Sequence, residues 1–94
     1  MPPVKIGVVG CGAIAQIQHL PNLMALREEF QVTVVCDQSP GLARYVAEFF
    51  NVPRYVTDYR DLLAAPGVDA VVLAAPTDRR EEMLLAACEA GKPV

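Results

Sequence analysis

The stretch VKIGVVGCGAIA, residues 4–15, decides the fold of this 94-residue chain. An almost unbroken apolar run, Val4 to Val9, comes directly before two closely spaced glycines, Gly10 and Gly12. A short continuous apolar run is typical of a strand buried on both faces, as in a parallel sheet. Small residues directly after it favour a tight turn into a helix. The stretch therefore predicts a strand, a glycine turn and a helix, in that order.

Two further apolar blocks, residues 32–35 and 68–73, predict two more buried strands. Helical patterns separate the blocks, and residues 55–57 and 59–63 predict a short edge strand and a short helix. This alternation predicts an α/β fold, a Rossmann-type parallel sheet with helices on both faces and strand order 3-2-1-4. Because the chain stops soon after its last helix, we expect the sheet to be truncated after about four strands, with any fifth strand only begun at residues 93–94.

Three helices have predicted boundaries or faces. The helix after the glycine turn should begin near Ala13, be interrupted at Pro21 and resume as a short turn through residues 23–28. The next has Ser39 as N-cap and Pro40 at its first position. Its i, i+3, i+4, i+7, i+8 pattern predicts a core-facing stripe of Leu42, Tyr45, Val46, Phe49 and Phe50. The last should span about residues 78–90, with an apolar face of Met83, Leu84, Ala87 and Cys88.

The glycine turn has the form G-x-G-x-x-A, from Gly10 to Ala15. Between a strand and a helix, the first glycine allows a tight turn and the second lets the backbone approach a pyrophosphate. Ala15 lets the helix pack closely on the strand. The N-terminus of the following helix offers free N–H groups and the positive end of its dipole to phosphates. The motif therefore favours dinucleotide binding, and an ordinary strand-to-helix turn is the alternative.

Asp37 falls at the end of the second predicted strand, about 20 residues after the glycine motif, where a carboxylate accepts hydrogen bonds from ribose hydroxyls. A solvated aspartate is the alternative. Gln38 follows, so no adjacent cation would offset the repulsion between Asp37 and the 2′-phosphate of NADP. NAD is therefore the expected cofactor. NADP is the less favoured one, and it is kept because Arg44 lies one turn into the next helix.

The segment AAPTDRR, residues 74–80, follows the third apolar block. Ligands of such sheets bind outside the carboxyl ends of the strands, so this loop should face the same crevice as Gly12. Its small residues and proline would let the backbone lie close to a cofactor, and a simple strand-to-helix turn is the alternative. Arg79 and Arg80 are expected to be solvated, with anion binding as the second interpretation.

Composition and charge exclude several classes of function. A net charge of −3 without a Lys/Arg cluster argues against nucleic acid or an anionic membrane as partner. No targeting segment is visible and no apolar run approaches the length of about 18 residues that spans a membrane, so we expect a cytoplasmic protein. Three cysteines without C-x-x-C spacing indicate neither a disulfide framework nor a zinc site. No metal ligand is expected, because no histidine or carboxylate cluster has metal-ligand spacing. No catalytic residue is expected either, since Cys11, whose side chain should point outward, has no histidine near it in sequence.

Five segments carry a family resemblance: residues 4–15, HLP at 19–21, DYRDLL at 58–63, VDAVVL at 68–73 and the closing residues 86–94. Together they resemble the Gfo/Idh/MocA family of glucose–fructose oxidoreductases and inositol dehydrogenases. The resemblance implies a two-domain NAD(P)-dependent oxidoreductase, acting on a sugar, a polyol or a related alcohol and forming a homo-oligomer. Residues 1–94 would be its incomplete N-terminal dinucleotide-binding domain. The C-terminal substrate domain would be absent from this chain, which alone should be inactive.

The cofactor-binding positions that the resemblance carries over are Gly10, Gly12, Ala13, Ile14, Asp37, Gln38, Ala75, Pro76 and Thr77. One position departs from the family pattern, since the family often has histidine where Arg80 stands. The alternative function is a nucleotide- or CoA-binding Rossmann module without catalysis. Asp37 argues against CoA, because a ribose with a 3′-phosphate would be repelled by the carboxylate.

Overall fold

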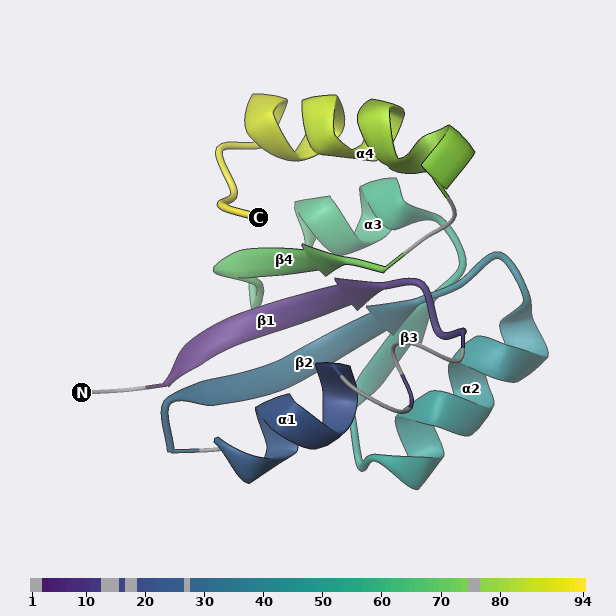
Figure 1. The fold of residues 1–94 in the computed structure, drawn as a ribbon, viewed down its shortest axis with the longest axis vertical. Coiled ribbons are helices and arrows are strands. Elements are labelled where there is room, and N and C mark those ends of the chain that lie inside the picture. The colour runs from purple at the N-terminus through teal and green to yellow at the C-terminus, as the bar shows by residue number, and fades with distance from the viewer. Residues whose placement is uncertain (1–2, 13–15, 17–18, 27, 75–76) are drawn as a thin grey trace.

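The structure is a computed structural model that describes residues 3–12, 16, 19–26, 28–74 and 77–94. Strands and helices alternate along the chain, as Figure 1 shows. The elements are β1 (Val4–Val9), α1 (Leu20–Ala25), β2 (Phe30–Cys36), α2 (Pro40–Phe49), β3 (Arg54–Val56), α3 (Tyr59–Ala64), β4 (Ala70–Leu73) and α4 (Thr77–Glu89).

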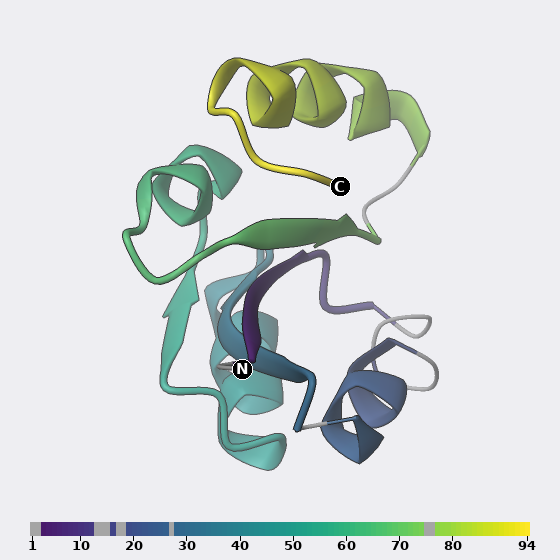
Figure 2. The ribbon, with the colours of Figure 1, turned by 90° about the vertical axis from the view of Figure 1, so that its left-hand side faces the viewer.

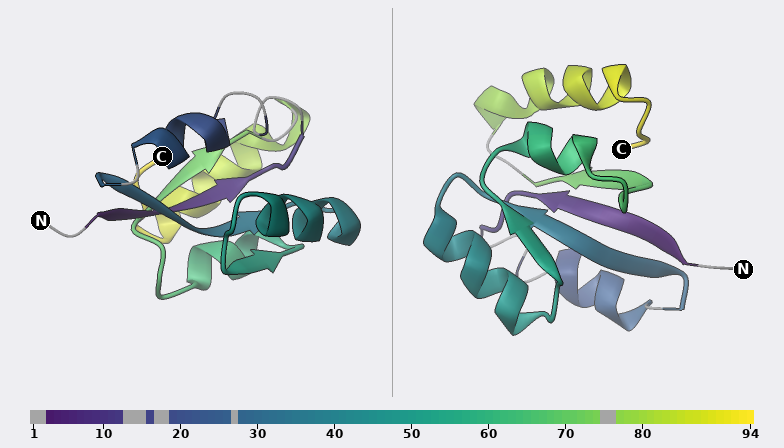
Figure 3. Two further views of the ribbon diagram at one scale, coloured as in Figure 1. Left: turned by 90° about the horizontal axis from the view of Figure 1, so that it is seen from below. Right: turned by 180° about the vertical axis from the view of Figure 1, so that it is seen from behind.

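The strands form one parallel sheet of four strands in the order β3-β2-β1-β4, which confirms the predicted fold class and strand order. Figure 3 shows the sheet from two further sides. The strand register places Val9, the last residue of β1, opposite Cys36 of β2 and Leu73 of β4. The carboxyl ends of the three longest strands therefore meet at one edge of the sheet, and the segments that follow them start side by side.

Each face of the sheet has its own apolar core, and Figure 2 shows α1 and α3 on opposite sides of β1. On one face, Leu62 of α3 and Met83 of α4 pack against the strands. On the other, Leu20 of α1 and Val46 of α2 do so. Helix α3 approaches β1 closely at Gly7, because an added Cβ there would lie 2.6 Å from Cδ2 of Leu62. A glycine in β1 thus lets α3 pack directly on the strand.

Helix α2 begins as predicted, with the Ser39 hydroxyl accepting a hydrogen bond from the Leu42 amide at 3.4 Å and with Pro40 in the first turn. The predicted core-facing stripe is confirmed in part, since Val46 is buried and Leu42 and Phe50 pack against the core, but two of its aromatic residues do not. Tyr45 and Phe49 are 55% and 65% exposed. The residues of α2 that are buried are Ala43, Val46 and Ala47. These small side chains let the helix lie close to the sheet and turn its aromatic side chains outward.

The other predicted helix features are confirmed in part. In α4, Met83 and Ala87 are buried as expected, whereas Leu84 and Cys88 are exposed. Helix α1 begins at Leu20 and contains Pro21 in its first turn, a position that tolerates proline. The start expected near Ala13 lies outside the described residues.

The last residues of the chain run beside the outer edge of β4 (Figures 1 and 2). The amide of Val71 donates a hydrogen bond to the Pro93 carbonyl at 2.8 Å. This contact agrees with the expectation that a further strand is only begun at residues 93–94. Among the described residues, no helix is both long and apolar enough to cross a membrane.

Candidate functional site

The turn after β1 is fastened to the end of β2. Gly10 has a φ of +100°, a backbone conformation that favours glycine. Its amide donates a hydrogen bond of 2.7 Å to the carbonyl of Cys36. The chain can therefore leave β1 sharply while remaining bound to the neighbouring strand, as the first glycine of the motif predicts.

Cys11 points into the core, which corrects the expectation that its side chain points outward. The residue is fully buried, and its Sγ donates to the Cys36 carbonyl at 3.6 Å. The sequence could not predict this burial, because Cys11 lies in a turn, where no hydrophobic periodicity applies. Burial raises the pKa of the Cys11 thiol to about 12, with a smaller contribution from the charge of Asp37. The thiol therefore stays protonated at neutral pH and is a poor nucleophile.

Asp37 follows β2 directly, and both of its carboxylate oxygens accept hydrogen bonds from backbone amides. Oδ2 accepts from the Cys11 amide at 2.9 Å, and Oδ1 accepts from the Ser39 amide at 2.9 Å. Asp37 is half-buried. The carboxylate thus joins the glycine turn to the start of α2 and has lone pairs left for a ligand.

Gly12 is the open point of this turn. It is exposed, and among the described residues nothing lies within 4 Å of the position that a Cβ would occupy. The Gly12 carbonyl accepts from the amide of Gln16 at 3.1 Å, and the Gln16 Nε2 donates to the carbonyl of Cys11 at 2.9 Å. Cys11 is therefore held in place, and the next residue, Gly12, is accessible. An anion could approach the backbone closely at Gly12.

The structure brings three predicted site residues together, namely Gly10, Gly12 and Asp37. Gln38 follows them and is exposed. Ala74 lies at the same edge, since its amide donates to the Val9 carbonyl at 2.8 Å. Other predicted residues lie outside the described part, namely Ala13, Ile14, Ala75 and Pro76, as does the side chain of Thr77, the first residue of α4.

The guanidinium of Arg44, which kept NADP open as an alternative, is paired within α2. Its Nε donates to Oε1 of Glu48 at 3.0 Å, and both side chains are exposed. This hydrogen bond with Glu48, and the charge of that carboxylate, raise the pKa of Arg44 above its usual value. In this arrangement Arg44 neutralises Glu48, one turn further along the helix.

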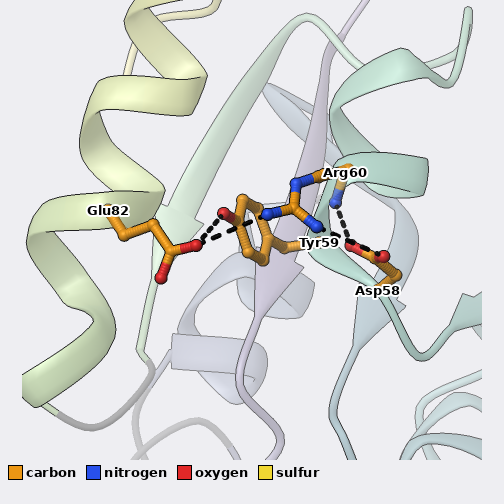
Figure 4. A network of polar contacts seen from close by, with 4 residues as sticks. All are labelled: Asp58, Tyr59, Arg60 and Glu82. Atoms are coloured by element: carbon orange, nitrogen blue, oxygen red, sulfur yellow. Dashed lines mark hydrogen bonds and ion pairs between the residues drawn. The ribbon is translucent and has the colours of Figure 1, made fainter.

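A second polar network joins the starts of α3 and α4 (Figure 4). The Tyr59 hydroxyl donates to Oε1 of Glu82 at 3.0 Å, and Nη2 of Arg60 lies 3.5 Å from the same oxygen. Asp58 caps α3 by accepting from the Arg60 amide at 2.9 Å. The Arg60 guanidinium also lies over the Tyr59 ring, 5.2 Å from its centroid. The first half of α4 is thereby held against the first turn of α3.

Sequence reasoning missed two of these features. The bond between Cys11 and Asp37 has a usable signal, because a parallel register that aligns Val9 with Cys36 brings the residues after each strand together. The bond between Tyr59 and Glu82 has none, since it depends on how two helices pack.

The chemistry of this edge suits a phosphate-bearing ligand with a sugar diol. Gly12 offers accessible backbone, and the carboxylate of Asp37 can accept hydrogen bonds from hydroxyl groups. In the part of the chain that the structure describes, no three His, Cys, Asp or Glu side chains are grouped to hold a metal ion.

Comparison with known proteins supports this interpretation. The sequence model described as the oxidoreductase family with an NAD-binding Rossmann fold matches residues 4–94. An inositol 2-dehydrogenase/D-chiro-inositol 3-dehydrogenase from Shouchella clausii is 42% identical over 93 residues, covering 97% of this chain and 26% of that protein.

Solved structures agree on the fold. An oxidoreductase from Thermotoga maritima superposes with a TM-score of 0.91 and 31% identity, covering 96% of this chain and 28% of that one. The 3-ketoreductase KijD10 from Actinomadura kijaniata, solved with NADP and TDP-benzene, has a TM-score of 0.89 and 33% identity, with coverage of 96% and 27%. The chain thus spans about a quarter of the length of the proteins it matches.

The match of the family model over nearly the whole chain agrees with the parallel sheet and with the glycine turn at its carboxyl edge. Residues 4–94 therefore belong to the Gfo/Idh/MocA oxidoreductase family, as its NAD-binding Rossmann fold.

Proposed function

We propose that this chain is the cofactor-binding part of a longer cytoplasmic oxidoreductase that transfers hydride between NAD and a polyol or sugar. The observation that carries the proposal is the Asp37 carboxylate, bound to the Cys11 amide beside the open Gly12 at the carboxyl edge of the sheet. Relatives named inositol 2-dehydrogenase support a polyol as the substrate class. Residues 1–94 would be the incomplete first domain, and a second domain would bind the substrate and support a homo-oligomer.

Each part of the proposed site has a role. Gly10 and Gly12 would bring the backbone to the pyrophosphate, with Ala13 and Ile14 at the start of the following helix. Asp37 and Gln38 would meet the adenosine ribose. Three further residues would line the cofactor from the loop after β4, namely Ala75, Pro76 and Thr77. The nicotinamide of the bound cofactor would supply the hydride chemistry.

NAD is the proposed cofactor in preference to NADP. A 2′-phosphate next to the ribose hydroxyl that Asp37 accepts would bring two anions together. The candidate cation Arg44 is already paired with Glu48, and Gln38 carries no charge. Repulsion without compensation would therefore disfavour NADP.

The 94 residues alone should not turn over a substrate. We assign no proton-transfer group to them, and such a group is commonly worth about 10²–10⁴-fold in rate. Without the second domain, the substrate would also lack positioning.

The test is a calorimetric titration of the full-length protein with NADH, NADPH and CoA, followed by assays of NAD-dependent oxidation of myo-inositol and other polyols. We expect NADH to bind more tightly than NADPH, and at least one polyol to be oxidised. In Asp37→Ala, the ratio of NADH affinity to NADPH affinity should fall. Binding of a nucleotide or CoA without any hydride transfer would instead favour the non-catalytic module.

A further inference from the structure

Asp37 does more in this structure than present a carboxylate to a ribose. Its Oδ2 accepts from the Cys11 amide in the glycine turn, at 2.9 Å. This hydrogen bond spans 26 positions of sequence, and it is half-buried. A hydrogen bond to a charged group contributes more to stability than a neutral one, so this contact can hold the turn in place before any ligand arrives.

The remaining contacts of the turn also converge on Cys11. Its side chain is fully buried beneath the turn, and its carbonyl accepts from Nε2 of Gln16 at 2.9 Å. The preceding residue, Gly10, is bound through its amide to the Cys36 carbonyl at 2.7 Å. Cys11 is therefore fixed through its amide, its carbonyl and its thiol, and of these three only the amide depends on a charge.

The next residue, Gly12, is exposed and has open space at its Cβ position among the described residues. Its backbone is the part of the turn that a diphosphate would approach. The orientation of the peptide groups at Gly12 depends on how Cys11 is held, because the two residues are adjacent.

We propose that Asp37 is a positioning residue for the diphosphate-binding turn, in addition to its contact with the ribose. This proposal rests on the proposed function, since it concerns the same cofactor site. Removal of the carboxylate would release the Cys11 amide and let the turn adopt several conformations. Cofactor binding would then weaken even for a ligand that has no ribose hydroxyl to offer.

The chain contains a matched control at the opposite end of β1. Asp69 accepts from the amide of Lys5 through its Oδ2 at 3.0 Å, so it also binds the backbone of this strand through a carboxylate. It lies at the amino end, away from the glycine turn. Asp69→Ala removes the same kind of bond without touching the proposed site.

The first measurement is hydrogen–deuterium exchange of the unliganded full-length protein, in the peptide that contains Cys11. Asp37→Ala should speed exchange there by roughly 10- to 150-fold, as expected for the loss of a charge-assisted hydrogen bond. Asp37→Asn keeps the shape and one acceptor oxygen, so it should give a smaller increase. Asp69→Ala should leave this peptide unchanged.

The second measurement is the affinity for an NADH analogue whose adenosine ribose is 2′,3′-dideoxy. Because this probe has no ribose hydroxyls to meet the carboxylate, a loss of affinity in Asp37→Ala must arise through the turn. We expect a loss of about tenfold in Asp37→Ala and none in Asp69→Ala. Equal affinity of wild type and Asp37→Ala for the analogue overturns the proposal, and so does unchanged exchange at Cys11. A wild-type protein that fails to bind NADH contradicts the proposed function instead, and exchange of the unliganded protein still decides whether Asp37 holds the turn.

Discussion

Each end of β1 is held by a hydrogen bond from a backbone amide to an aspartate carboxylate, but the surroundings of the two bonds differ. At the amino end, Asp69 and Lys5 bind each other through a carboxylate and through their backbones, in an exposed position. At the carboxyl end, Asp37 binds Cys11 in a half-buried position, next to a buried thiol and an open glycine. The same kind of aspartate–amide bond can therefore join two chain segments at one end of a strand and hold a ligand-facing turn at the other.

Breaking the turn itself should have the largest effect. Gly10→Ala places a Cβ at a φ of +100°, which should lower the free energy of unfolding by about 1–3 kcal/mol and abolish measurable NADH binding. The matched variant at the amino end is Gly67→Ala, which has open space at its Cβ position among the described residues. It should leave both quantities nearly unchanged. Urea unfolding and NADH titration measure the two effects, and similar losses in both variants would contradict the contrast between the ends.

Gly12→Ala should separate binding from stability. The added Cβ meets no described atom within 4 Å, so the free energy of unfolding should hardly change. The same methyl group would occupy the surface that a diphosphate approaches, and NADH affinity should fall roughly 10- to 150-fold if one charge-assisted contact is lost. Calorimetry together with thermal unfolding tests this. Unchanged affinity would remove Gly12 from the proposed site.

The buried thiols should make the carboxyl end sensitive to high pH. Burial, followed by the charge of Asp37, raises the pKa of Cys11 and of Cys36 from 9.0 to about 12. The unfolded chain releases these protons above about pH 9 and the folded chain holds them until about pH 12. The stability that the two protonated thiols contribute is therefore fully present below about pH 9, and it is lost as the pH rises from about 9 to about 12.

Each thiol should contribute at most about 1.4 kcal/mol per pH unit to this loss. Cys11→Ala should give a shallower pH dependence than wild type between pH 9 and 12, measured by urea unfolding. Cys88, which is exposed, provides the control, because Cys88→Ala should leave the slope unchanged. Identical slopes for wild type and Cys11→Ala would show that burial does not hold this proton.

The smallest effect concerns Arg44. Because its ion pair with Glu48 is exposed, Arg44→Ala should cause no measurable change in stability or in NADH affinity. In the Asp37→Ala background, the guanidinium of Arg44 could leave Glu48 for a 2′-phosphate, so NADPH affinity should be lower in the double variant than in Asp37→Ala alone. Equal NADPH affinities in those two proteins would mean that Arg44 stays with Glu48.

The sequence was sufficient for the order of the elements and for the residues at the carboxyl edge. Continuous apolar blocks distinguish doubly buried strands, and the structure pairs two of them, β1 and β2, in parallel. The sequence was insufficient for the face of α2, because Ala43, Val46, Ala47 and Phe50 satisfy the same spacing as the predicted stripe. Periodicity locates an apolar arc, and packing against the sheet then selects the smaller side chains within it.

The site divides in a similar way. Motif spacing identified Gly10, Gly12 and Asp37, which the structure brings together. Spacing could not show that Cys11 is buried, since that depends on three-dimensional contacts between separate segments. The bond of Asp37 to the turn could be expected only once the register of β1 and β2 is known.

The contact between Gly7 and Leu62 has an evolutionary consequence. With 2.6 Å between an added Cβ and the leucine, position 7 cannot take a larger residue unless the side chain at position 62 shifts or is smaller. Among homologous sequences, a residue larger than glycine at position 7 should therefore occur together with a smaller residue at position 62. Such paired variation in an alignment would indicate that α3 contacts β1 at this point. The variation at either position alone would not.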